Sequence, residues 1–194
     1  MKAITQISSR TVVLPFSDID TDQIIPARFL TTTTRDGLGK HLFSEWRYLE
    51  NGDPDPGFVL NDPAYSDCHI LVAGNNFGCV SSREHAPWAL LDFGINAIIS
   101  TELADIFCSN ALKNGLLPVV VDRDTHQWLI DNPGAVVEID IAESTLTLPD
   151  RRVTSYPIDA FARYCLLEGT DQLGYLQKHS ELIGEFEERR TWTP

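Results

Sequence analysis

Residues 74–85 combine the residue types of a site that binds an anion, and they read GNNFGCVSSREH in one-letter code. Two glycines let the backbone bend close to a ligand, and the free N–H groups at the start of a following helix favour negative charge. Arg83 directly follows the hydroxyls of Ser81 and Ser82, and a planar guanidinium can hold a carboxylate with two parallel hydrogen bonds. The segment therefore predicts a cradle for a carboxylate.

Other motifs fit this segment less well. Its glycines match neither a P-loop nor G-x-G-x-x-G, and neither serine sits in the G-x-S-x-G of hydrolases. Ser81 and Glu84 have the spacing of a capping box, which would make the serine a helix cap and nothing more. With Ser81 as N-cap, Pro87 would lie well inside the helix, whereas a start near Arg83 places Pro87 close to the tolerant first turn. The capping and ligand-binding interpretations both stay open.

Asp18, Asp20 and Asp22 alternate with Ile19 and Thr21 in a short polar turn. The pattern resembles the opening of a calcium loop, but it lacks the glycine and the closing glutamate of an EF-hand. We favour an Asx-rich turn that projects one carboxylate inward, and we expect Asp22 to be that group.

The cysteines and histidines show no metal-binding or redox spacing. The four cysteines form no C-x-x-C pair and no dense disulfide framework. Cys79 lies beside the candidate loop, but the adjacent sequence supplies no base that would activate it as a nucleophile. His69 and His85 have no partner histidine at metal spacing, so we expect packed or hydrogen-bonded roles for them. The other cysteines are Cys68, Cys108 and Cys165.

The candidate loop falls between a strand and a helix in an alternating β-α-β-α-β series. Such a series predicts a parallel sheet with a binding site at the carboxyl ends of its strands. Strands are expected at residues 11–16, 69–73, 95–100 and 116–121, with helices at 83–93 and 102–113. Short β segments at 135–141, 144–148 and 151–154, and helices at 158–168 and 173–190, complete the expected elements.

The chain has 194 residues, 43% of them apolar, and a formal net charge of -13. This length and composition predict a single domain over residues 1–194. The shortage of Lys and Arg disfavours nucleic acid and anionic membranes as partners, and the apolar runs are too short to span a bilayer. A cytoplasmic location is expected. The many turn formers between residues 31 and 63 predict a long functional loop.

Several motifs together resemble the 3-isopropylmalate dehydratase small-subunit family. The longest is NFGCVSSREHAPWAL at residues 76–90, and DTDQIIP at residues 20–26 resembles the family's N-terminal motif. Shorter matches extend the resemblance over essentially the whole chain: Phe29-Leu30, HLF at 41–43, Trp46-Arg47, FVLN at 58–61, ADIF at 104–107 and IDAF at 158–161.

The resemblance implies an α/β fold, namely a swivelling β/β/α three-layer domain of the aconitase type. It implies a separate large subunit that carries a [4Fe-4S] cluster, with no cofactor bound by this chain. The implied reaction interconverts 2-isopropylmalate and 3-isopropylmalate through isopropylmaleate in leucine biosynthesis. The small-molecule substrate is thus a dicarboxylate.

The same resemblance assigns roles to individual side chains. Ser81 would be the catalytic base that takes a proton from carbon, while Ser82 and Arg83 would bind a substrate carboxylate. Thr21 and Asp22 match family positions near the site, and we expect Asp22 to orient Arg83 or a group of the partner.

Two segments carry the implied specificity and chemistry. Residues 74–83 would form the active-site loop. Residues 31–48 resemble the family's substrate-discriminating loop, whose apolar members would face the isopropyl group, with Leu38, Leu42 and Phe43 as candidates.

Val80 departs from the family pattern, which usually has glycine at this position. If the backbone there has a positive φ, a β-branched valine is disfavoured and the loop must adjust. This departure keeps two alternatives open. One is a paralogous hydratase small subunit that acts on another alkyl-substituted malate or maleate, and the other is a non-catalytic carboxylate-binding module.

Overall fold

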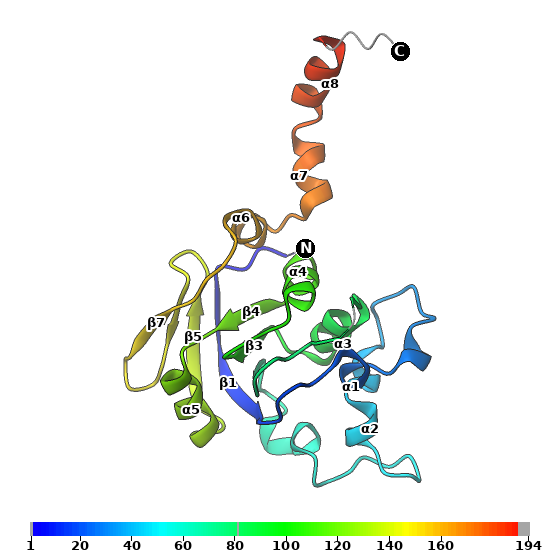
Figure 1. The fold of residues 1–194 in the computed structure, drawn as a ribbon, viewed down its shortest axis with the longest axis vertical. Coiled ribbons are helices and arrows are strands. Elements are labelled where there is room, and N and C mark those ends of the chain that lie inside the picture. Colours follow the sequence, from blue (N-terminus) through cyan, green and yellow to red (C-terminus); the bar gives the residue numbers. More distant parts are fainter. Residues whose placement is uncertain (1, 81, 190–194) are drawn as a thin grey trace.

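The computed structural model describes residues 2–80 and 82–189. These residues form a mixed α/β fold on one curled sheet of seven strands, in the order β4-β3-β2-β1-β5-β6-β7 (Figure 1). β1 (Gln6–Leu14) lies inside the sheet and joins two halves of different polarity. The mixed α/β class expected from the sequence is confirmed.

On one side of β1 the strands run parallel, as the alternating pattern predicted. β1 pairs with β2 from Thr11↔Ile70 to Leu14↔Ala73. Every residue of β2 and β3 is buried, which is typical of parallel strands that are covered on both faces. The bounds of these strands are β2 (Ile70–Ala73), β3 (Ala97–Ser100) and β4 (Leu117–Val120).

On the other side of β1, antiparallel strands extend the sheet. The amino-terminal half of β1 pairs with β5 from Gln6↔Asp140 to Arg10↔Val136. Buried and exposed residues alternate along β5, as expected for a sheet with one solvated face. The bounds are β5 (Val136–Asp140), β6 (Thr145–Thr147) and β7 (Val153–Ser155).

Aspartates and glycines set the ends of the main helices. Asp122 and Asp159 cap α5 and α6, because each side chain accepts a hydrogen bond from the backbone N–H three residues further on. Gly94 and Gly115 end α3 and α4 in the left-handed conformation, with φ values of 108° and 89°. The bounds are α3 (His85–Phe93), α4 (Asp105–Asn114), α5 (Arg123–Asp131) and α6 (Ala160–Glu168).

The start of α3 differs slightly from the one that the sequence predicts. The helix begins at His85 with Glu84 as N-cap, two residues later than predicted. Pro87 therefore lies in the first turn, where a missing N–H is tolerated. The capping-box interpretation rests on Ser81, which lies outside the described residues.

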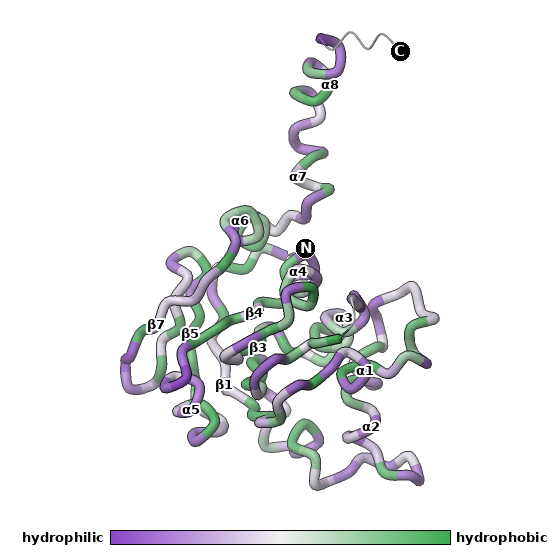
Figure 2. The backbone as a smooth tube through the Cα atoms, in the orientation of Figure 1, coloured by the Kyte–Doolittle hydropathy of each residue, from purple (hydrophilic) through white to green (hydrophobic). Residues whose placement is uncertain are grey.

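Two apolar clusters pack on the two faces of the sheet. Leu71 and Ala73 of β2 belong to one cluster, and Ile70 and Val72 belong to the other. This alternation follows from the way successive side chains of a strand point to opposite faces. Figure 2 shows the hydrophobic residues along β3 and β4 in the interior of the fold.

The segment between β1 and β2 folds into short helical turns. Leu38, Leu42 and Phe43 are 3%, 0% and 0% exposed and belong to the core. The expectation that they face the alkyl group of a ligand is therefore not met. The bounds of the turns are α1 (Thr21–Ile24), α2 (Ser44–Arg47) and the 3-10 helices Ala27–Phe29, Gly39–His41, Val59–Asn61 and Pro63–Tyr65.

The last described helices project from the body as an arm (Figure 1). They are α7 (Gln172–Lys178) and α8 (Ser180–Arg189). The single helix expected over residues 173–190 is thus two helices, because His179 leaves helical geometry with φ -108° and ψ 15°. Residue 190 lies outside the described part of the chain.

Candidate active site

Arg83 and Asp22 form an ion pair between the loop that follows β2 and the short helix that follows β1. Nη1 of Arg83 donates a hydrogen bond to Oδ1 of Asp22. This hydrogen bond is the main cause that lowers the pKa of Asp22, against an opposing effect of burial. The Arg83 side chain is 18% exposed and that of Asp22 is 49% exposed, so the pair lies near the surface.

A capping box holds Asp22 in place. The side chain of Asp20 accepts from the backbone N of Gln23 at 2.8 Å, and the Gln23 side chain accepts from the backbone N of Asp20 at 2.8 Å. These bonds fix the start of α1 and leave Asp22, in its first turn, facing Arg83. The predicted Asx-rich turn is therefore present, but the side chain of Asp22 is half exposed and faces Arg83 rather than the interior.

Asp18 has a separate role in the same turn. Its carboxylate accepts from Nδ2 of Asn76 at 2.8 Å, which ties the turn to the candidate loop. Among residues 2–80 and 82–189, no group of three or more His, Cys, Asp or Glu side chains could hold a metal ion.

Backbone hydrogen bonds hold the two loops side by side where β1 and β2 end. The backbone N of Gly78 donates to the carbonyl of Ile19 at 2.7 Å, and that of Thr21 donates to the carbonyl of Cys79 at 3.2 Å. Ligands of open parallel sheets bind at this carboxyl edge. The pairing brings Thr21 and its neighbour Asp22 to the loop, although these residues lie far from it in sequence.

The loop glycines are required for packing within the chain. A Cβ on Gly74 would overlap the backbone carbonyl of Phe16. Gly78 has a φ of 79°, and a Cβ there would overlap the ring of Phe107. Both glycines therefore pack closely against the chain, Gly74 against Phe16 and Gly78 against Phe107.

Val80 has a φ of 77°, and the residue is 86% exposed. A positive φ is strained for a β-branched side chain, while glycine adopts it without cost. Strain of this kind concentrates at functional loops, where the surrounding structure imposes it. Val80 therefore has the positive φ at which a valine was expected to be disfavoured.

The hydroxyl groups of the predicted site differ in their surroundings. Ser82 is exposed, while Ser81 is not among the residues that the structure describes. Thr21 is 1% exposed, and its Oγ1 has no hydrogen-bond partner among the described residues. A buried hydroxyl without a partner costs free energy, so Thr21 marks a place where a further polar group would be stabilised.

Arg35 lies near the candidate loop and was not predicted from the sequence to do so. Its Cζ lies 5.2 Å from the centroid of the Trp88 ring. Nearby, Nε2 of His85 lies 3.0 Å from the carbonyl oxygen of Thr32, so His85 is the hydrogen-bonded histidine that was expected. These contacts hold residues 31–37 against the first turns of α3. No local sequence signal could reveal them, because the partners are more than fifty positions apart.

Cys79 is not activated as a nucleophile. Burial is the main cause that raises the pKa of its thiol, and the charges of Asp20 and Asp18 raise it further. The thiol is therefore protonated at neutral pH, which agrees with the role expected from the sequence.

The chain is similar to known proteins over nearly its whole length. Residues 1–124 match the aconitase C-terminal domain family. The chain is 59% identical over 187 residues to the 3-isopropylmalate dehydratase small subunit of Anaeromyxobacter dehalogenans (strain 2CP-C), covering 96% of this chain and 98% of that protein. It is 53% identical to the small subunit from Roseiflexus sp. (strain RS-1), covering 98% of this chain and 95% of that protein.

A solved structure shows the same fold. The crystal structure of 3-isopropylmalate dehydratase from Methanocaldococcus jannaschii is similar with a TM-score of 0.68 and 28% identity, covering 93% of this chain and 98% of that one. The α/β fold with its loop at the carboxyl edge is that of an aconitase C-terminal domain, the swivel type that the motifs implied. Within this class, the chain belongs to the 3-isopropylmalate dehydratase small-subunit family.

The helices leave no candidate for a membrane span. Within residues 2–80 and 82–189, none combines the length and the apolar character that crossing a bilayer requires.

Proposed function

We propose that the chain is the small subunit of a two-chain hydro-lyase that interconverts 2-isopropylmalate and 3-isopropylmalate in leucine biosynthesis. The small-subunit relatives match it over nearly their full length, which supports the same activity here. The structural observation that carries the proposal is the Arg83–Asp22 ion pair, which holds a guanidinium at the ligand-binding edge of the sheet.

The proposed reaction divides between two chains. Loss of water from 2-isopropylmalate gives isopropylmaleate, and addition of water in the other orientation gives 3-isopropylmalate. Each direction requires a base for a carbon-bound proton, a Lewis acid for the hydroxyl and cations for the carboxylates. This chain supplies the base and a carboxylate-binding cation.

Arg83 binds a substrate carboxylate in this proposal. Asp22 accepts from Nη1, which leaves Nε and Nη2 of the guanidinium for a planar two-pronged contact. Asp22 thereby positions Arg83 before the substrate arrives. Ser82 directly precedes Arg83 in the chain and donates to the same carboxylate. Because the chain carries a net charge of -13, it repels an acidic substrate at long range. Arg83 must therefore attract the substrate carboxylate at close range.

Ser81 is the proposed acceptor of the proton from carbon. A serine hydroxyl is a very weak acid, so its alkoxide needs backbone N–H donors, the start of α3 and Arg83 in a site from which water is excluded. The exposed neighbours Val80 and Ser82 support a second requirement, namely that the large subunit covers the loop in the working enzyme.

The [4Fe-4S] cluster belongs to the large subunit in this proposal. Cluster ligands are cysteine thiolates gathered at one place, and among residues 2–80 and 82–189 no group of three or more His, Cys, Asp or Glu side chains could hold a metal ion. The cysteines of this chain therefore do not fit a cluster of their own. When bound by the partner, the cluster supplies the Lewis acid that holds the leaving hydroxyl.

Substrate discrimination falls to the exposed start of the 31–48 segment. The buried side chains of that segment belong to the core, whereas residues 31–37 lie against α3 beside the loop. We assign the contact with the alkyl group to these residues. We also propose a cytoplasmic location, which the four free cysteine thiols support.

A paralogous hydratase that acts on another alkyl-substituted diacid is the second candidate. The positive φ of Val80 favours it, because the usual glycine would leave this loop unstrained. The two candidates differ only in which diacid the enzyme turns over fastest.

Steady-state kinetics separate the two candidates. The chain is reconstituted anaerobically with its large subunit and assayed on 2-isopropylmalate, citraconate and dimethylmalate. We expect the highest kcat/KM on 2-isopropylmalate. A clear preference for either other diacid would establish the second candidate, and failure to recover any iron–sulfur partner with the tagged chain would remove both.

A further inference from the structure

α7 and α8 form the arm that projects from the body in Figure 1, and this arm carries exposed apolar side chains along its length. Leu173, Leu176 and Leu182 are 63%, 53% and 60% exposed, and Ile183 is 37% exposed. Neither helix contains a buried residue. Large apolar side chains grouped in this way mark an interaction surface rather than a random surface feature.

The body of the chain contacts the arm near its base, where Lys178 of α7 pairs with Glu168 of α6. Tyr175 anchors α7 to α6, with its ring centroid 5.0 Å from that of Phe161 and 5.8 Å from that of Tyr164. α7 has seven residues and α8 has ten, and helices of this length are marginal in water without tertiary packing. A partner that covers the apolar side chains would supply this packing.

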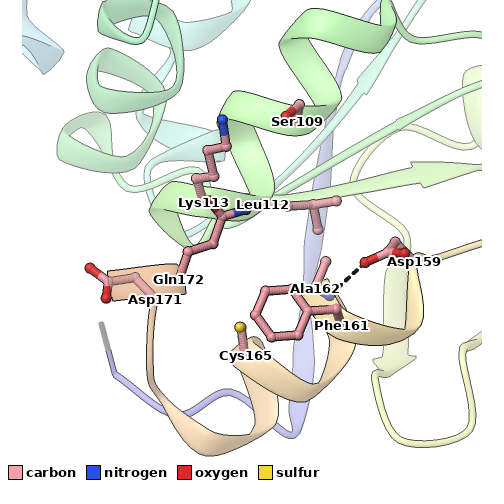
Figure 3. Close-up of a pocket in the computed structure, with 9 residues that line it drawn as sticks. All are labelled: Ser109, Leu112, Lys113, Asp159, Phe161, Ala162, Cys165, Asp171 and Gln172. Atoms are coloured by element: carbon pink, nitrogen blue, oxygen red, sulfur yellow. Dashed lines mark hydrogen bonds between the residues drawn. The ribbon is translucent and has the colours of Figure 1, made fainter. Parts of the chain in front are cut away.

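A pocket of about 220 Å³ opens at the base of the arm, between α4 and α6 (Figure 3). Leu112, Phe161 and Cys165 line its apolar part, and Asp171 and Gln172 bring the start of the arm to its rim. The pocket is therefore continuous with the arm and can accept an apolar side chain from outside. We call the pocket together with the exposed leucines of the arm the arm surface.

Charge indicates which partner fits the arm surface. Glu181, Glu187 and Glu188 have no cationic partner among the described residues, whereas Lys178 and Arg189 each pair with a glutamate. Two copies of the arm would bring these carboxylates together, and like charges disfavour such a contact. A groove with an apolar floor and a basic rim fits the arm, as in the recognition of other amphipathic helices.

We propose that the arm surface docks into such a groove on the large subunit. This rests on the proposed function, which names the partner. The match to the aconitase C-terminal domain family ends at residue 124, whereas the small-subunit relatives match 96% and 98% of this chain, arm included. The arm is therefore shared with relatives named as small subunits and lies outside the match to the domain family.

The position of the arm makes it a second contact, separate from the candidate active site. Its base lies at the amino end of β1, where the backbone N of Ile4 donates to the carbonyl of Leu166 at 2.9 Å. The loop with Arg83 lies at the opposite end of the same strand. Two contacts with one partner raise the effective concentration of each, so the arm would hold the chains together while the loop is free to release product.

Binding of arm variants to the purified large subunit tests the proposal. We expect the double variant Leu176→Asp/Leu182→Asp to weaken the Kd for the large subunit at least tenfold. Gly184→Asp is the control for the charge on α8, because it adds one carboxylate there, as Leu182→Asp does, but about 200° around the helix from Leu182. A Cβ at Gly184 meets nothing within 4 Å, so we expect a Kd within twofold of the wild type.

Three outcomes separate the possibilities. An unchanged Kd for the double variant, with far-UV circular dichroism confirming that it is folded, overturns the proposal. Self-association of the small chain that the double variant abolishes also overturns it, since the arm would then serve a second copy. A complex that assembles through the arm but shows no dehydratase activity removes the proposed function and supports the docking.

Discussion

Arg83 and Asp22 are 61 positions apart in sequence, yet their side chains form an ion pair where β1 and β2 end. The capping box of α1 fixes the backbone that carries Asp22, so the guanidinium is held by a rigid turn. An arginine held in this way keeps donor atoms for a carboxylate and loses little entropy when it binds one.

Removing the charge of Asp22 tests its positioning role. We expect Asp22→Asn to lower kcat/KM about ten- to a hundredfold in the reconstituted enzyme, because a neutral amide holds the guanidinium less firmly. Asp18→Asn is the control, since Asp18 bonds Asn76 and does not contact Arg83. Equal losses in the two variants would show that the turn matters only as a whole.

The lowered pKa of Asp22 predicts a pH dependence of stability. The ion pair contributes fully to the free energy of unfolding above the usual carboxyl pKa of 3.8, and the contribution is lost as the pH falls through the lower pKa of the folded chain. Because the pair is partly exposed, we expect about 1 kcal/mol or less. Urea unfolding should give different free energies of unfolding for the wild type and Asp22→Asn at neutral pH, and the same free energy for both in acid. A difference that persists in strong acid would contradict this origin.

Replacing the guanidinium by an ammonium tests the carboxylate contact. Arg83→Lys should raise KM about tenfold or more with a smaller effect on kcat, because lysine cannot present two parallel donors. Arg152→Lys, in an exposed pair with Asp150, serves as the remote control. An unchanged KM in Arg83→Lys would count against direct substrate binding.

The strained backbone at Val80 predicts a gain of function. We expect Val80→Gly to raise kcat/KM for 2-isopropylmalate and to raise the free energy of unfolding by roughly 1 kcal/mol, because glycine adopts a φ of 77° without strain. Kinetics and urea unfolding of the variant measure both effects. Unchanged or lower values would show that the loop accommodates valine.

Gly78→Ala should destabilise the fold. The added methyl group would overlap the ring of Phe107 at a φ of 79°, so we expect a loss of about 2 kcal/mol or more in the free energy of unfolding. Gly184→Ala, where a Cβ meets nothing within 4 Å, should be neutral or stabilising. A neutral Gly78→Ala would mean that the loop shifts freely.

Local patterns predicted much of the parallel half of the fold. The buried run at β2 and the glycines at 94 and 115 gave the alternation of strands and helices, because periodicity and helix ends are properties of neighbouring residues. The placement of Arg83 at the carboxyl edge of the sheet followed from that alternation.

Contacts between distant segments escaped prediction. The packing of Gly78 on Phe107 and the stacking of Arg35 on Trp88 join residues that only the folded chain brings together. The burial of Leu38, Leu42 and Phe43 likewise depends on where the 31–48 segment packs, since apolar side chains serve a core as well as a ligand. The break at His179 depends on local geometry that composition does not reveal.

In the proposed function, this chain supplies the proton acceptor for a reaction that the large subunit completes. The most direct test is the kcat of Ser81→Ala in the reconstituted complex. We predict normal assembly and a kcat lowered by about a thousandfold, within the usual range for loss of a general base. Near-normal turnover by Ser81→Ala would contradict the account.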